Sequence, residues 1–140
     1  MTDFMSALRG YLLGCKEVTD LCESRIYVLS LPAEELKTTA HKCVVLMSSG
    51  GELNPRRSIS EARVDVVCYG ETDFEAAAME RPVAEALKGL NRVVYANVLL
   101  HNATVASGPY QARDPDTFWP CMRRQAILRA DEREVGSATV

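Results

Sequence analysis

The sequence predicts an α+β fold, with a mainly antiparallel sheet and one long helix and an N-terminal helix packed on it. Three observations support this class. Segments with a strand pattern outnumber those with a helix pattern, regular alternation of strand and helix is missing, and the segment 73–88 has a strong helical pattern. A parallel sheet would need that alternation, so helices gathered on one face of the sheet are the expected arrangement.

The N-terminal part predicts short elements, identified by the spacing of apolar residues and by the residues that end each segment. Apolar residues three or four positions apart indicate a helix, and an unbroken apolar run indicates a buried strand. Pro32 ends the first strand or marks the turn that follows it, because proline has no backbone donor. The expected elements are a helix at 3–15, a helical turn at 18–22, a strand at 25–29, a helical turn at 33–36 and a strand at 42–47.

The long helix is predicted by its ends as well as by its apolar stripe. Thr72 and Glu75 form a capping-box pattern, which opens a helix at 73–88. Gly89 is a natural C-terminal end for this helix. Pro82 lies inside it and removes one backbone hydrogen bond, so we expect a kink there.

Strand patterns dominate the rest of the chain. The clearest lies at 60–69, where apolar and charged residues alternate with the period of a half-buried strand. Glycine, proline and small polar residues predict loops at 48–57 and 108–118. Further strands are expected at 93–100, 102–107 and 122–130, and a flexible charged tail at 131–140 is expected to follow a single domain at 1–130.

The composition limits the classes of function. A chain of 140 residues fits one domain, and 47% apolar with 25% charged residues is typical of a folded protein. The net charge of −3 gives no sign of a basic surface for nucleic acid. We see no signal peptide and no apolar run long enough for a membrane span, so we expect no membrane partner and synthesis in a cytoplasm.

The sequence contains no recognisable catalytic motif. His41 and Cys43 lie two positions apart, so on one strand they would share a face, as a Cys–His nucleophile pair requires. No third orienting group is evident, and Cys43 begins an apolar run. The cysteines are odd in number and none are spaced as C-x-x-C, which predicts free buried thiols and argues against disulfides and zinc. We therefore expect no enzyme activity, no cofactor and no metal.

Six residues are candidates for contact with a neighbouring subunit: Arg56, Arg57, Asp114, Asp116, Phe118 and Trp119. The arginine pair either forms salt bridges with a neighbour or remains as solvated loop charges. The two aspartates flank a proline, and they either hold the loop through turn hydrogen bonds or bind Ca²⁺ weakly. The aromatic pair either anchors the loop to its own core or inserts into a neighbour.

The order and spacing of these features resemble the tail terminator, or tail completion, proteins of long-tailed bacteriophages and gene transfer agents. The resemblance spans residues 4–130, and its individual pieces are common ones. Pro82 and the low aromatic content depart from the family pattern. The pieces are the N-terminal helix ending near Cys15, Arg-Ile-Tyr-Val at 25–28 with Pro32, the strand at 43–47, the strand at 62–69 leading into the helix that ends with Val-Ala-Glu-Ala-Leu at 83–87, Asp114 and Asp116 around Pro115, and the strand at 123–130.

This resemblance implies a structural virion protein at the tail–neck junction, assembled in the host cytoplasm. Family members form a ring, typically a hexamer, that caps the tail tube, stops its growth and joins the tail to the head–neck. The implied partners are copies of the chain, the tail tube protein and a head-completion or neck protein, with DNA passing through the lumen without sequence-specific binding. The alternatives are another head–tail connector or neck component, a small cytoplasmic enzyme using Cys43, or a binding module outside any particle.

Overall fold

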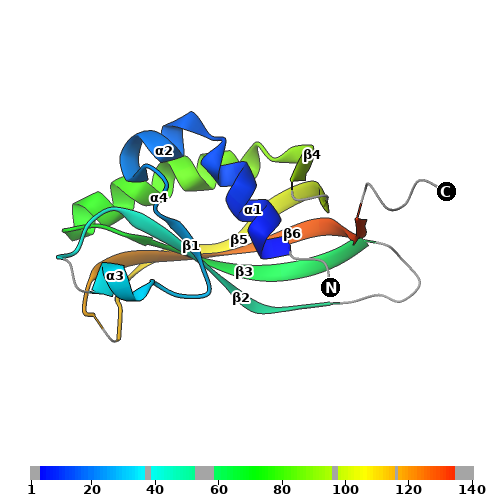
Figure 1. The fold of residues 1–140 in the computed structure, drawn as a ribbon. Coiled ribbons are helices and arrows are strands. Elements are labelled where there is room, and N and C mark those ends of the chain that lie inside the picture. The colour runs from blue at the N-terminus through cyan, green and yellow to red at the C-terminus, as the bar shows by residue number, and fades with distance from the viewer. Residues whose placement is uncertain (1–3, 37–38, 53–58, 96–97, 116, 135–140) are drawn as a thin grey trace.

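The computed structural model describes residues 4–36, 39–52, 59–95, 98–115 and 117–134. Three helices, α1, α2 and α4, cover one face of a sheet, and the short helix α3 lies on the opposite side (Figure 1). In chain order the elements are α1 (Phe4–Leu13), α2 (Lys16–Cys22), β1 (Ile26–Val28), α3 (Ala33–Leu36), β2 (Cys43–Glu52), β3 (Ile59–Tyr69), α4 (Asp73–Lys88), β4 (Asn91–Tyr95), β5 (Val98–Arg113) and β6 (Pro120–Glu134).

The strands form one six-stranded sheet in the order β1-β2-β3-β6-β5-β4. β1 pairs with β2 in parallel, and every other neighbouring pair is antiparallel. The predicted fold class is therefore confirmed. Among the described residues, no helix combines the length and the apolar character that crossing a bilayer requires.

Apolar side chains are buried on both faces of the sheet. The larger cluster lies between the sheet and the helices, and it takes Val64, Val66 and Cys68 from alternate positions of β3. The other face carries the short helix α3, and we call it the helix-free face because none of the longer helices α1, α2 and α4 covers it. It has a smaller apolar cluster near one end. That cluster consists of Cys43, Val45, Val67, Tyr69, Trp119 and Cys121.

The long helix has the bounds that its sequence predicts. The Thr72 side chain accepts a hydrogen bond from the Glu75 backbone nitrogen at 3.2 Å, as the capping pattern requires. Gly89 caps the other end, and α4 continues through Pro82. The helix is also joined to the sheet by an ion pair between buried Glu80 and Arg124 of β6.

Several strands in the structure are longer than predicted. The sequence predicts loops over 48–52 and 108–113, but these segments belong to β2 and β5, and β6 runs to Glu134 into the predicted tail. The strand expected at 93–100 is divided between β4 and β5. The physical reason is that small and polar residues fit β-bulges: the register shifts between Ser48 and Gly50, and again between Ser107 and Tyr110.

Candidate functional site

The loop between β5 and β6 is held in place by hydrogen bonds to Asp114. Its Oδ1 accepts from the Thr117 backbone nitrogen at 3.1 Å, and its backbone oxygen accepts from the Phe118 nitrogen at 2.8 Å. Its Oδ2 accepts from the Tyr69 hydroxyl at 2.7 Å. Burial, helped by this bond, raises the pKa of Tyr69. The interpretation that Asp114 holds the loop through turn hydrogen bonds is therefore confirmed.

The two aromatic residues of this loop differ in exposure. Trp119 is only 7% exposed and packs edge-on against Tyr69, with ring centroids 5.8 Å apart. Phe118 is 71% exposed and has a φ of 59°. A positive φ is strained for a large side chain, and such strain concentrates at functional positions. Trp119 thus anchors the loop to its own chain, while Phe118 remains available to a partner.

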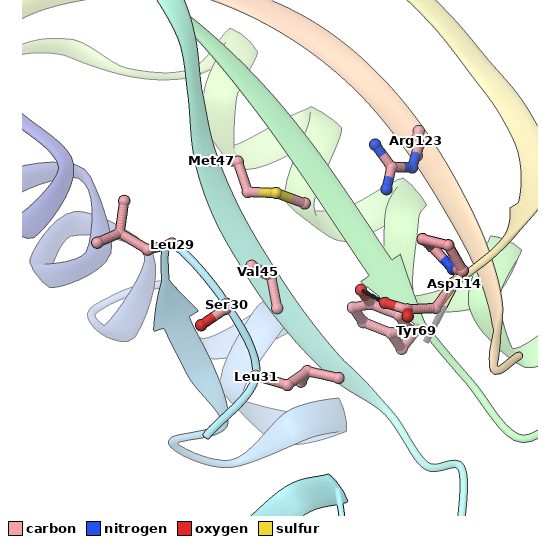
Figure 2. Close-up of a pocket in the computed structure, with 9 residues that line it drawn as sticks. Leu29, Ser30, Leu31, Val45, Met47, Tyr69, Asp114 and Arg123 are labelled. Atoms are coloured by element: carbon pink, nitrogen blue, oxygen red, sulfur yellow. Dashed lines mark hydrogen bonds between the residues drawn. The ribbon is translucent and has the colours of Figure 1, made fainter. Parts of the chain in front are cut away.

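A groove of about 410 Å³ lies beside this loop on the helix-free face. Figure 2 shows side chains from the segment after β1, from β2 and from the loop facing the same hollow. Leu29 at its rim is 67% exposed and, like Phe118, has a positive φ, in this case 79°. The lining residues are Leu29, Ser30, Leu31, Val45, Met47, Tyr69, Asp114, Pro115 and Arg123.

The outer edge of β2 is a second feature that suits a partner. β1 pairs with β2 only along 44–46, whereas β2 itself continues to Glu52. In the described part of the chain, no strand pairs with 47–52 on that side. An open strand edge presents backbone donors and acceptors that another strand can satisfy. The groove and this edge meet at Met47, which lines the groove.

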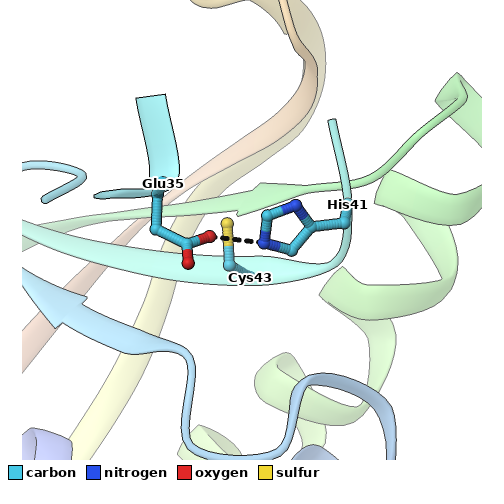
Figure 3. Close-up of side chains that lie close together, drawn as sticks. All are labelled: Glu35, His41 and Cys43. Atoms are coloured by element: carbon cyan, nitrogen blue, oxygen red, sulfur yellow. Dashed lines mark ion pairs between the residues drawn. The ribbon is translucent and has the colours of Figure 1, made fainter. Parts of the chain in front are cut away.

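The third feature is a group of polar side chains, in which Glu35 of α3 lies close to His41 and Cys43 (Figure 3). His41 Nε2 forms an ion pair with Glu35, and His41 Nδ1 lies 2.8 Å from the Thr39 carbonyl oxygen. Cys43 is fully buried, and burial raises the pKa of its thiol to about 12. Because the thiolate is the nucleophile, a covered and protonated Cys43 does not suit covalent catalysis.

Comparison with known proteins gives a likeness in fold. No protein-family model and no curated protein matches the chain. A solved structure described as the virion of a native gene transfer agent particle contains a chain with a similar fold, at a TM-score of 0.68 and 14% sequence identity. The match covers 91% of this chain and 94% of that chain. At this identity, the likeness shows that the two chains share a fold.

The candidate residues from the sequence divide between the loop and the undescribed segments. Asp114, Phe118 and Trp119 lie together in the β5–β6 loop, whereas Arg56, Arg57 and Asp116 lie outside the described residues. Sequence reasoning missed Leu29 and Glu35. An apolar residue at a strand end usually indicates core, and nothing in the local pattern indicates that α3 folds back over Cys43.

Proposed function

We propose that this chain is a structural virion protein, and specifically a tail terminator that forms a ring, with a hexamer as the expected number. The observation that carries the proposal is the fold shared with a chain of a gene transfer agent virion along nearly the full length of both chains. The order of the sequence features resembles the same family. The surface described above supports the proposal because it suits contact with copies of the chain.

Subunit contacts in the ring would use the exposed apolar residues and the open strand edge. Leu29 and Phe118 are both strained and exposed, and burying such a side chain yields about 1.5–3 kcal/mol. The edge of β2 offers backbone hydrogen bonds to a neighbour. The apolar side chains would supply binding free energy, and the strand edge would fix the register and so the orientation of the neighbouring subunit. A closed ring requires both.

In the proposed role the ring sits on the last ring of the tail tube, halts tube growth and presents its other side to the neck protein. No bond-making step is needed, so the chain is proposed to have no enzyme activity. DNA passes through the central hole, where a chain with a net charge of −3 would repel phosphates rather than bind them. Arg56, Arg57, Asp116 and the tail 131–140 remain candidate contacts between subunits or rings.

The runner-up is another component of the head–tail connection. Adaptor proteins of that kind are largely helical, and head-closure proteins are small β-barrels. An open six-stranded sheet with a 16-residue helix on one face favours the terminator over both.

The test is the assembly state of the purified chain, with and without the tail tube protein of the same particle. Light scattering and negative-stain microscopy are expected to show rings, or rings at the ends of tubes once the tube protein is added. Phe118→Ser is expected to reduce ring formation, while Phe74→Ser, at an 89% exposed phenylalanine of α4, leaves it unchanged. A chain that stays monomeric beside growing, uncapped tubes contradicts the proposal.

A further inference from the structure

We propose that Glu35, His41 and Cys43 form a binding site for one transition-metal ion, with Zn²⁺ the ion that best suits them. Each residue offers one donor atom, and the three donors lie within 4.8 Å of one another (Figure 3). The set combines a carboxylate oxygen, an imidazole nitrogen and a sulfur, all of which bind zinc in proteins. This departs from the expectation of no metal, which rested on the absence of C-x-x-C spacing.

The donor types select the metal. A thiolate sulfur disfavours Mg²⁺ and Ca²⁺, which take oxygen ligands. Bond lengths to zinc of about 2.0–2.3 Å at tetrahedral angles place ligand atoms roughly 3.3–3.7 Å apart, so small side-chain rotations bring these donors into place. Three protein ligands leave the fourth position for water. The Cys43 thiol gives up its proton to solvent as the sulfur binds, and His41 Nε2 likewise gives up the proton of its ion pair with Glu35.

Neighbouring groups already orient two of the donors. A carbonyl oxygen can only accept a hydrogen bond, so His41 Nδ1 donates to Thr39 O at 2.8 Å, and this bond directs Nε2 toward Glu35. A histidine that binds metal commonly donates its other ring N–H to a backbone carbonyl in this way. The Tyr27 hydroxyl is hydrogen-bonded to Glu35. An ion bound between Nε2 and the carboxylate would replace the ion pair of these two side chains.

The position of the site suggests what the ion does. It would link α3 to the first residue of β2 on the helix-free face. His41 also contacts the Trp119 ring, with centroids 5.3 Å apart, so the link reaches the β5–β6 loop. The side chains of His41 and Glu35 are 29% and 15% exposed, which leaves an entry path for an ion. The inference does not depend on ring formation.

The experiment titrates the chelator-treated full chain with Co²⁺ and with Zn²⁺. We expect one ion per chain, and a cobalt complex with tetrahedral visible bands and a thiolate-to-cobalt charge-transfer band. Zinc at about 100 times its Kd is expected to raise Tm by roughly 5–10 °C. Cys43→Ala is expected to lose the charge-transfer band, whereas Cys121→Ala, an equally buried cysteine of the same cluster, keeps it.

Two further variants test metal binding in case Cys43→Ala does not fold. His41→Gln alters a partly exposed side chain and is expected to abolish stoichiometric binding. Tyr27→Phe removes the hydroxyl that orients Glu35 and is expected to weaken zinc binding by about 10–100-fold. The proposal is overturned if no charge-transfer band appears with excess Co²⁺, or if the His41→Gln chain binds one ion as tightly as the native chain. Ring assembly is scored separately, so the two proposals fail independently.

Discussion

Trp119 is the residue on which the helix-free face depends most. It is the largest side chain of the small cluster and packs on both Tyr69 and His41. Trp119→Ala should remove this packing and lower the free energy of unfolding by about 3–5 kcal/mol, as other large-to-small changes of buried aromatic residues do. Urea unfolding measures this, with Trp119→Phe as the milder control. A loss below about 1 kcal/mol would contradict the packing described here.

Tyr11 gives a prediction about alkaline pH. Its hydroxyl donates to the Ala86 carbonyl oxygen at 2.6 Å, which joins α1 to α4. Burial, with a smaller effect of Cys15, raises the pKa of Tyr11 to about 12. The folded chain thus holds this proton more tightly than the unfolded chain, where the pKa is about 10. The resulting stability is complete below pH ~10 and is lost as the pH rises to about 12.

Tyr11→Phe should therefore have two effects. It should lower the free energy of unfolding by about 1 kcal/mol at neutral pH, and it should flatten the fall in stability above pH ~10. Urea midpoints of both chains across this pH range measure the difference. Tyr110→Phe, at a residue that is 57% exposed, is the matched control. Parallel pH profiles for the native and Tyr11→Phe chains would show that this proton is not linked to folding.

Single residues were predictable where their chemistry acts locally. Turn hydrogen bonds are one of the two roles that the sequence predicts for Asp114, because aspartate beside proline favours turns, and Asp114 accepts a hydrogen bond from Thr117, three positions away. Glu35 was not predictable as a partner of Cys43. Its approach depends on how α3 packs over the sheet, and no sequence pattern encodes that packing.

At the scale of elements, the bounds of α4 are set by local interactions, whereas those of β5 are set by pairing with other strands. Thr72 and Gly89 lie at the ends of α4 and fixed its bounds, since helix capping is a local interaction. The length of β5 depends on its pairing with β4 and β6, and bulges allow the pairing with β6 to continue past Ser107. Glycine and proline near 108 therefore predict a loop, whereas pairing with β6 keeps this part of β5 in a strand.

The ion pair between Glu80 and Arg124 is a polar link between α4 and the sheet. Their side chains are only 9% and 15% exposed. Glu80→Ala should leave the Arg124 guanidinium buried without its carboxylate and lower the free energy of unfolding by about 3–5 kcal/mol. The double change Glu80→Leu with Arg124→Met should recover most of this loss, because neither charge is then buried. Chemical denaturation of the three chains measures it, and equal losses in the single and double variants would contradict this account.

At the scale of the whole molecule, the sheet is covered unequally. The α+β class was predictable because the period of each segment determines which faces are apolar. The strand order β1-β2-β3-β6-β5-β4 was not, since it depends on pairings between residues far apart in the chain. The helix-free face is closed at one end by Trp119 and its neighbours, and beside them lies the groove. This unequal covering connects the fold to the proposed assembly.

Leu29 offers a test of the link between fold and assembly. Its exposure and its positive φ are unfavourable in the monomer, whereas its apolar side chain favours the proposed ring. It is 67% exposed with a φ of 79°, a conformation that asparagine tolerates better than leucine. Leu29→Asn should therefore leave the monomer as stable as the native chain, or more stable by up to about 1 kcal/mol. The same change removes an apolar anchor, so ring assembly should weaken by about tenfold or more.

Urea unfolding at low protein concentration measures the monomer, and sedimentation across a concentration series measures the ring. Phe74→Asn, at the exposed phenylalanine of α4, should leave assembly unchanged. If Leu29→Asn destabilises the monomer by more than 1 kcal/mol and leaves assembly intact, Leu29 belongs to the fold and not to the interface. The expected opposite result means that the chain retains a strained, exposed leucine because a neighbouring subunit covers it.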